Sequence, residues 1–221
     1  IFDKFNATLD GQLCALKGGT VCAIKNYTVT ADTQSNYDGG LYNNLSGATI
    51  RNLAINMDMN ITNNGGGTKV QVGMLAGYAG ASTISNVTLS GSLNYQDNIG
   101  ETSFVGGAVG YLDKTNMYDN SSSIDVTSHG SRDSFTGGLV GIGYSSKVYF
   151  NSASGDVNNW STREAYTGGL IGYTENGEYY KNYTTNDVTA LSLDNAYTGG
   201  LTGMTRSGDY HQNYTVGTVS G

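Results

Sequence analysis

The sequence predicts an all-β protein, a right-handed parallel β-helix (β-solenoid) of about six coils of ~31 residues with three short strands each. Three observations predict this fold: a repeated unit, residue types that recur at fixed positions within it, and a composition with 33 glycines, 17 tyrosines and no proline. No segment shows the apolar period of about 3.6 residues, with capping residues, that an amphipathic helix needs.

The repeated unit is marked by a glycine pair followed by an aliphatic residue, as in "GGLIG" at 168–172. We place the first glycine of successive units at Gly39, Gly73, Gly106, Gly137, Gly168 and Gly199, with spacings of 34, 33, 31, 31 and 31 residues. A propeller blade is longer, at ~40 residues with four strands. One coil cannot bury its inward face, whereas stacked coils place equivalent side chains ~4.8 Å apart in a continuous core.

Three residue types recur at fixed positions in the unit. An aromatic residue lies two positions before the glycine in five units: Tyr37, Phe104, Phe135, Tyr166 and Tyr197. An asparagine lies thirteen or fourteen positions after it: Asn52, Asn86, Asn120, Asn151, Asn182 and Asn213. A valine follows in the last four units: Val126, Val157, Val188 and Val219. We expect the aromatic column to form interior stacks and the asparagine column to form a hydrogen-bonded ladder at a bend.

The elements follow in order along the chain. Residues 1–37 are expected to form an N-terminal lead-in coil, because they have strand-like segments but no glycine pair followed by leucine. Residues 38–221 are expected to form one continuous repeat solenoid, a module of a longer chain. In a typical unit the strands are "GGLIGY", "EYYKNYTT" and "DVTALS" (168–173, 178–185 and 187–192). No capping pattern follows the last unit, so we expect either that the natural protein continues beyond Gly221 or that this open end meets a partner.

The two cysteines lie in the lead-in coil. Cys14 and Cys22 flank the turn-forming pair Gly18-Gly19, and a disulfide between them would indicate an oxidising compartment. The alternative is a pair of reduced, buried thiols. The spacing of zinc-binding cysteine pairs is absent.

Charge and hydropathy exclude two classes of partner. The formal net charge is −7, and only 13% of the residues are charged. Nucleic acids and anionic membranes both require clustered basic residues, which the sequence lacks. No apolar run approaches the ~20 residues of a membrane-spanning helix, so we expect no membrane insertion.

The repeats also resemble a known family. "GGLVG" followed by "VYFNSASGDV", and "TGGLIGYTENGEYYKNYTTNDV" (167–188), resemble the GLUG repeat over nearly the whole chain. The resemblance implies a secreted or surface-anchored, adhesin-like protein at an extracellular or cell-surface location. It implies no catalytic residues of the repeat itself.

An aspartate column carries the clearest chemical pattern. Asp125, Asp156 and Asp187 lie 31 residues apart, and Thr218 takes the place in the last unit. Three interpretations remain open: capping of backbone N–H groups at an exposed corner, a Ca²⁺ site, or the acid pair of a glycosidase. The histidines, His129 and His211, lie in no known catalytic motif, and His211 takes the place of a repeated tyrosine.

Four tyrosines are candidate ligand contacts: Tyr111 and Tyr173 after the glycine pair, and Tyr183 and Tyr214 after the asparagine. Exposed aromatic rings stack on sugars, although such columns also fill the interior of a β-helix. We therefore expect a non-enzymatic extracellular surface module, adhesin-like or a structural stalk, that binds a glycan or a host or cell-surface protein. The alternatives are the subunit of a self-assembling extracellular filament and a carbohydrate-active enzyme using the Asp125, Asp156 and Asp187 column. No cofactor is expected other than Ca²⁺.

Overall fold

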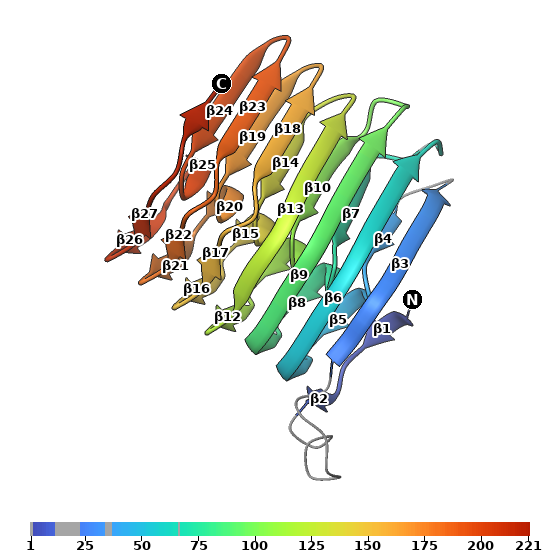
Figure 1. Cartoon of the computed structure of the whole chain (residues 1–221), viewed down its shortest axis with the longest axis vertical. Coiled ribbons are helices and arrows are strands. Elements are labelled where there is room, and N and C mark those ends of the chain that lie inside the picture. The colour runs from blue at the N-terminus through green and yellow to red at the C-terminus, as the bar shows by residue number, and fades with distance from the viewer. Residues whose placement is uncertain (1, 12–22, 34–36, 66) are drawn as a thin grey trace.

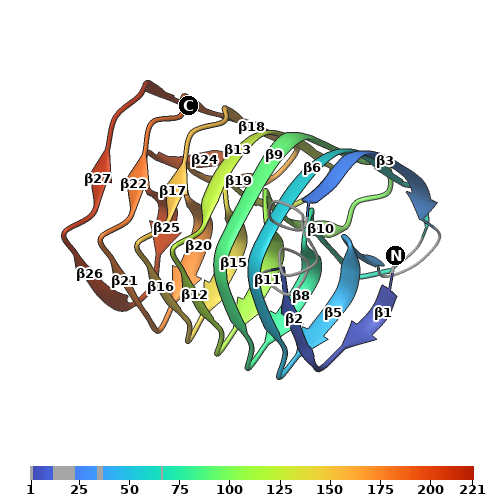
Figure 2. The same ribbon diagram turned by 60° about the horizontal axis from the view of Figure 1, so that its bottom comes forward.

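The structure is a computed structural model that describes residues 2–11, 23–33, 37–65 and 67–221. The described residues are all-β, and every strand pair that they form is parallel. Successive coils lie side by side from the N-terminal to the C-terminal end, in blue to red order (Figures 1 and 2). The predicted β-solenoid is therefore confirmed. This part of the chain has no helix long and apolar enough to cross a membrane.

Each repeat begins on sheet C, which has six strands. These are β4 (Tyr37–Gly39), β7 (Lys69–Gly73), β10 (Thr102–Gly106), β14 (Ser134–Gly137), β19 (Glu164–Gly168) and β24 (Asn195–Gly199). Side chains alternate between the core and the surface, as in any strand. In β10, Ser103 and Val105 are buried, whereas Phe104 lies half-exposed between them.

A tight glycine-containing turn leads to sheet A, which has seven strands. These are β1 (Phe2–Phe5), β5 (Tyr42–Ser46), β8 (Ala76–Gly80), β11 (Val109–Asp113), β15 (Val140–Tyr144), β20 (Ile171–Glu175) and β25 (Thr202–Thr205). Sheets C and A approach each other at backbone distance. A Cβ atom on Gly141 would lie 2.5 Å from the carbonyl oxygen of Gly110 and 2.7 Å from the backbone nitrogen of Val105. This close approach explains why glycine recurs here in every later unit.

The third and widest sheet, sheet B, has fifteen strands. These are β2 (Thr8–Asp10), β3 (Ala23–Thr33), β6 (Thr49–Asn63), β9 (Thr83–Asp97), β12 (Asn116–Tyr118), β13 (Ser121–Gly130), β16 (Lys147–Tyr149), β17 (Ser152–Ala153), β18 (Val157–Ser161), β21 (Gly177–Tyr180), β22 (Tyr183–Thr184), β23 (Val188–Ser192), β26 (Gly208–His211), β27 (Tyr214–Thr215) and β28 (Val219–Ser220). The early coils cross the sheet as single strands of 15 residues, β6 and β9. The next coil crosses it as two strands, β12 and β13, and the later coils cross it as three shorter strands.

The core consists of ladders of equivalent side chains. One ladder runs through sheet B in register: Ile50, Ile84, Met117, Val148, Tyr179 and Tyr210. All but the last are nearly or fully buried. Stacking thus supplies the continuous core that no single coil has.

The register corrects the predicted alignment of the first unit. Asp38 pairs with Gln71, and Gln71 pairs with Phe104, so Asp38 rather than Tyr37 holds the position of the aromatic column. Gly40 then corresponds to Gly73. Because residues 39 and 40 are both glycine, either one can be aligned with Gly73, and the aromatic residue at 37 favoured the wrong alignment.

The asparagine column also divides into two. Asn52 and Asn86 have left-handed backbones, with φ of 57° and 50°, and Asn86 lies opposite Asp119, which has a φ of 55°. The asparagines from Asn120 onward lie one residue later. Asn52 and Asn86 thus form the left-handed bend itself, whereas the asparagines from Asn120 onward follow the bend and form a buried ladder.

The prediction that the aromatic column before the glycines forms an interior stack is wrong. Phe104, Phe135 and Tyr166 are half-exposed, and Tyr197 is 36% exposed. Their rings lie on the outward face of sheet C, with centroids 4.5 to 5.4 Å apart between neighbouring coils. The rings are stacked from Phe135 to Tyr197 and tilted between Phe104 and Phe135.

Candidate functional site

A buried asparagine ladder shapes the bend in sheet B. The Asn151 side chain accepts hydrogen bonds at Oδ1 from the backbone N (3.0 Å) and Nδ2 (2.9 Å) of Asn120. Its Nδ2 donates to the carbonyl oxygen of Met117 (2.9 Å) and to Oδ1 of Asn182 (3.2 Å). Asn182 repeats the pattern with Asn213. The predicted hydrogen-bonded ladder is thus present from Asn120 onward, and it holds the residues on either side at fixed positions.

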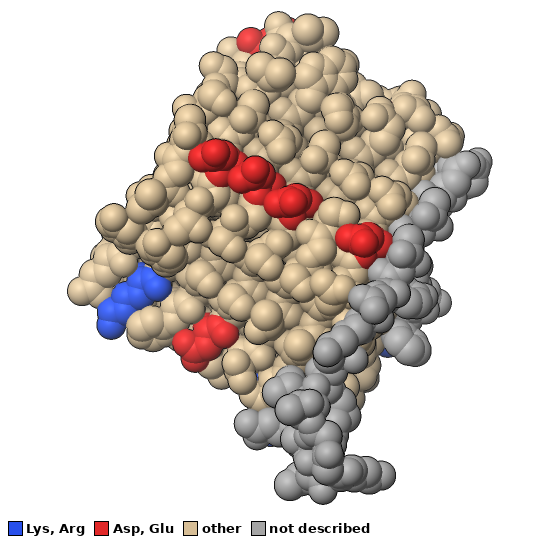
Figure 3. Space-filling model, in the orientation of Figure 1, with Lys and Arg blue, Asp and Glu red and all other residues tan. Residues whose placement is uncertain are grey.

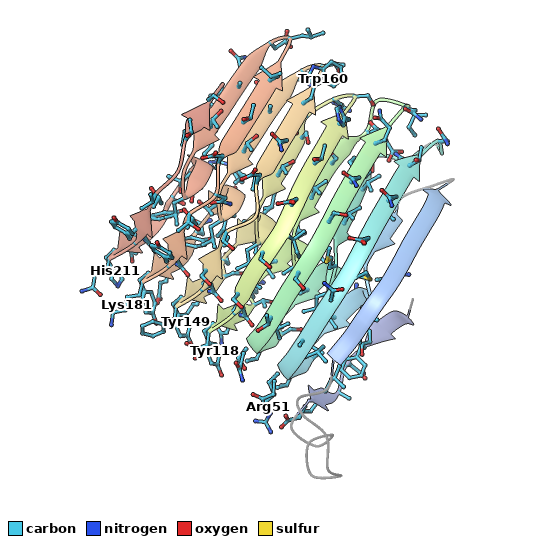
Figure 4. All side chains as sticks on the ribbon, viewed as in Figure 1. Arg51, Tyr118, Tyr149, Trp160, Lys181 and His211 are labelled. Carbon is cyan, nitrogen blue, oxygen red and sulfur yellow. The ribbon has the colours of Figure 1, made fainter. Side chains whose placement is uncertain are left out.

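The residues just before this bend form what we call the tyrosine ladder: Tyr118, Tyr149, Tyr180 and His211. The centroids of successive rings are 5.1, 4.9 and 4.9 Å apart, and their planes are 9°, 4° and 2° from parallel. The ladder lies along one side of the solenoid (Figure 4). The equivalence of His211 with the repeated tyrosine, predicted from the sequence, is confirmed by its pairing with Tyr180.

Two further side chains project from the bend itself. Phe150 and Lys181 have left-handed backbones, with φ of 57° and 54°. Phe150 is 47% exposed, and its ring lies at a steep angle to Tyr149 and Tyr180, 70° and 73°. Lys181 Nζ lies 5.0 Å from the centroid of the Phe150 ring, within the range of a cation–π interaction. Aromatic and cationic groups therefore share this surface.

A polar hollow adjoins the tyrosine ladder. Lys147 and Glu178 line it together with Asp209, and Lys147 Nζ lies 2.8 Å from Glu178 Oε1. The hydrogen bond to Glu178, and then its charge, raise the pKa of Lys147. Each of these residues lies two positions before a ring of the ladder. The outward face of each strand therefore carries a charged side chain followed by a ring.

Tyr183 and Tyr214 lie just beyond the asparagine ladder on sheet B. They are 44% and 61% exposed, and their rings stack at 5.5 Å and 1°. In the preceding coil the same position is held by Ser152. The column is therefore a two-ring stack at the C-terminal end of the solenoid.

Tyr111 and Tyr173 lie on a different sheet. Both belong to sheet A, where Ile142 separates them in the column. The Tyr111 ring contacts Phe104 at 5.7 Å, and the Tyr173 hydroxyl donates to Glu175 Oε2 at 3.3 Å. Burial is the main cause that raises the pKa of both tyrosines. The structure thus divides the four predicted contacts between two faces.

The aspartate column lies exposed on sheet B. Asp125 Oδ1 accepts the backbone N–H of Asp156 (3.0 Å), Asp156 Oδ1 accepts that of Asp187 (3.3 Å), and Asp187 Oδ1 accepts that of Thr218 (2.7 Å). Figure 3 shows acidic side chains in a row across this face. Asp58, through Ser92, extends the column toward the N-terminus. This geometry supports the interpretation of each aspartate as a backbone cap.

No group of three His, Cys, Asp or Glu side chains suited to a metal ion occurs among the residues that the structure describes. Cys14 and Cys22 lie outside the described residues, so their disulfide stays a prediction.

The sequence analysis recognised the column shared by His211 and the repeated tyrosine, but not its extension to Tyr118 or its position on the surface. A second surface feature escaped it. An apolar patch with Trp160 (36% exposed) and Leu191 (57% exposed) lies toward the other end of the sheet B strands (Figure 4). Trp160 and Leu191 share one column with His129, but the residue type changes from coil to coil, so the repeat gave no signal for this patch.

Comparison of the chain with protein-family models, with curated proteins and with solved structures yields no match. The resemblance to GLUG repeats therefore stays a prediction based on the quoted motifs.

Proposed function

We propose that the protein is a non-enzymatic extracellular surface module whose solenoid presents the tyrosine ladder and the Tyr183–Tyr214 pair to a glycan. The observation that supports this proposal most directly is the exposure of these rings on one sheet. Tyr183 and Tyr214 are 44% and 61% exposed, and the parallel strands fix their positions. A rigid aromatic surface loses little conformational entropy on binding.

The surface chemistry favours a carbohydrate ligand. Stacked rings cover one another's faces within a column, so a sugar ring has access to the outer faces, the edges and the hydroxyl groups. Tyr214 presents an outer face, and Phe150 adds a half-exposed ring to the same bend. Lys147 and Glu178 add charged groups able to hydrogen-bond sugar hydroxyls. A host or cell-surface protein remains the second ligand class for this face.

A glycan array probed with the purified chain tests the proposal. We expect binding to a defined set of glycans, and a loss of roughly tenfold or more, ~1.4 kcal/mol, in the Tyr183→Ala/Tyr214→Ala double variant. Both side chains are exposed, so the double variant is expected to keep its fold.

Two matched variants locate the site. Trp160→Ala removes an exposed aromatic ring from the other end of sheet B, and Tyr197→Ala removes one from sheet C. We expect both to bind like the parent. Binding that survives the double variant but fails in either control would place the site elsewhere, and an array without any signal would count against a glycan ligand.

A second function, the subunit of a self-assembling filament, is favoured by the equal length of the later coils, because such coils pair strand for strand, as β19 does with β24 and β22 with β27. Strands β24 to β28 pair on one side only, and Val216, Val219 and Met204 are 49%, 46% and 38% exposed. A strand set of the same repeat, from another copy, would cover these side chains as β19 to β23 cover the inner side. Light scattering across a concentration series would show growth in mass, and a constant monomer mass would exclude this function.

The carbohydrate-active enzyme is the weaker alternative. Each aspartate of the column already holds a backbone N–H of the next coil. We expect Asp156→Ala to cost about 1 kcal/mol of stability, as the loss of a capping group does. Hydrolysis of a glycan by the parent that disappears in this variant would favour the enzyme instead.

A further inference from the structure

Two carboxylates are buried together where sheet B turns toward sheet C. Asp97 ends β9 and Glu101 immediately precedes β10, and each is only 3% exposed. They lie outside the repeat columns, because the later units are shorter in this turn. Burial of a charged group is costly unless an opposite charge or hydrogen bonds offset it.

Asparagine and serine groups hold the two carboxylates together. Asn63 Nδ2 donates to Asp97 Oδ1 and to Glu101 Oε2, at 3.0 Å each. Asp97 Oδ2 accepts the backbone N–H of Glu101 (2.9 Å) and the backbone and hydroxyl groups of Ser131. Three coils thus converge here, through Asn63, Asp97 and Ser131. None of these donors carries a positive charge.

Two oxygen atoms at this corner remain without a hydrogen-bond partner: Glu101 Oε1 and the Tyr95 hydroxyl. Tyr95 is 1% exposed. Tyr95 and Asp97 lie two residues apart and are buried on the same face of β9. Burial, and then the charges of Asp97 and Glu101, raise the pKa of Tyr95. No lysine or arginine forms an ion pair with Asp97 or Glu101 in the described part of the chain.

We propose that Asp97 and Glu101 bind a divalent cation, of which Ca²⁺ fits best, with Glu101 Oε1 and the Tyr95 hydroxyl among its oxygen ligands. Ca²⁺ takes six to eight oxygen ligands in flexible geometry and accepts carboxylates, amide oxygens, carbonyls and water. At this corner Ca²⁺ balances the two negative charges and is coordinated by both unpartnered oxygens.

A proton shared by the two carboxylates is the competing way to reduce their charge. A proton on Glu101 would remove one of the two negative charges and could give Glu101 Oε1 and the Tyr95 hydroxyl a common hydrogen bond. A divalent cation would balance both charges. This corner also differs from the aspartate column, where all carboxylates are exposed and bonded to the backbone.

The site would link neighbouring coils at the turn between sheet B and sheet C. Asp97 and Glu101 lie at the two ends of one turn, while Asn63 belongs to the preceding coil and Ser131 to the following one. Cation binding therefore stabilises the stacking of three coils, and removal of the cation is expected to loosen this turn first.

Terbium luminescence and thermal unfolding test the proposal on the full chain. Tb³⁺ substitutes for Ca²⁺ and emits when a nearby tyrosine is excited, so Tyr95 serves as a built-in donor. We expect Tb³⁺ emission that CaCl2 displaces, and a rise of several degrees in Tm with CaCl2 relative to EDTA. MgCl2 is expected to act more weakly.

Three variants assign the effect to this corner. Glu101→Gln is expected to lower Ca²⁺ affinity at least tenfold, whereas Asp156→Asn, in the exposed column, is expected to keep it. Tyr95→Phe is expected to reduce the Tb³⁺ emission and to retain a Ca²⁺-dependent rise in Tm, which provides a readout even where Glu101→Gln fails to fold. A parent chain with equal Tm in CaCl2 and EDTA would overturn the proposal and favour the shared proton, as would an equal loss in Glu101→Gln and Asp156→Asn.

Discussion

At the bend of sheet B, an asparagine side chain makes the hydrogen bonds that a backbone peptide group makes elsewhere in the sheet. The backbone of Phe150 or Lys181 turns left-handed there, and the strand pieces on either side cannot continue the ladder. The amide of the next asparagine supplies one acceptor and two donors at the missing positions. Buried backbone groups thereby keep their partners, which a folded chain requires.

Asn151→Ala is therefore expected to destabilise the protein by roughly 2–4 kcal/mol, because it removes several buried hydrogen bonds and leaves their partners unsatisfied. Asn94→Ala is the matched control, since among the described residues the Asn94 amide donates to Asn60 alone, on an exposed face. We expect it to cost less than about 0.5 kcal/mol. Urea unfolding of both variants measures the difference, and equal losses would contradict the role of the buried ladder.

Tyrosine ionisation predicts how stability responds to alkali. Burial, and then the charge and hydrogen bond of Asp113, raise the pKa of Tyr78 to about 12. A tyrosine in the unfolded chain loses its proton near pH 10, so between about pH 10 and 12 the unfolded state binds fewer protons than the folded state. The free energy of unfolding is therefore expected to fall as pH rises through this range.

Absorbance at the tyrosinate band and urea unfolding at several alkaline pH values measure this effect. Tyr78→Phe removes one such group, and its stability is expected to fall less steeply with pH than that of the parent. Identical slopes would show that Tyr78 ionises as freely in the folded chain as in the unfolded one.

At the scale of the strand, glycine sets the distance between sheets C and A. A Cβ atom on Gly141 would overlap two backbone atoms of neighbouring strands, whereas Gly100, with a φ of 90°, has no atom within 4 Å of such a Cβ. We expect Gly141→Ala to cost about 3 kcal/mol or more through overlap. Gly100→Ala is expected to cost about 1 kcal/mol through backbone strain alone. Thermal unfolding separates the two, and a smaller loss in Gly141→Ala would show that the sheets can move apart.

The repeat period predicted part of the strand arrangement and missed part of it. The period of 31 residues predicted the stacking and the equivalence of Tyr180 with His211, because stacked coils force equal positions into register. It misplaced Tyr37, since two glycines in a row fit two phases. It gave no signal for the burial of Asp97 beside Glu101, because the two residues flank a turn whose length differs between units and whose hydrogen bonds join separate coils.

For the surface contacts the limit was different. The columns of Tyr183 and Tyr214 were readable, but their exposure was not, because an alternating strand offers the same spacing on either face. Phe104 shows the consequence: its column was expected inside and lies on the surface.

For the whole molecule, the parallel stack predicts a gradient of local stability. Coils that include β9 and β13 have neighbours on both sides, whereas strands β26 to β28 pair with β21 to β23 alone. We expect backbone amides of the last coil to exchange with solvent faster than those of β9, because local opening there exposes less apolar surface. Hydrogen exchange by mass spectrometry measures this. Protection of the last coil that rises with protein concentration would support self-association, and uniform exchange would show that the stack opens as one unit.

The constant spacing of 31 residues over the last coils also gives the solenoid the properties of a ruler. Duplication or loss of one complete unit moves everything downstream by one strand separation, ~4.8 Å, without rotating it to another side. A residue inserted within a strand has no such neutral outcome, since it turns the following side chains of that strand to the opposite face. The turns absorb single residues, as they do between the Asp38–Gln71 pair and the Tyr42–Ala76 pair. Changes in reach would therefore come in fixed steps, and the distance between the Asp97–Glu101 corner and the Tyr183–Tyr214 pair would be set by counting units.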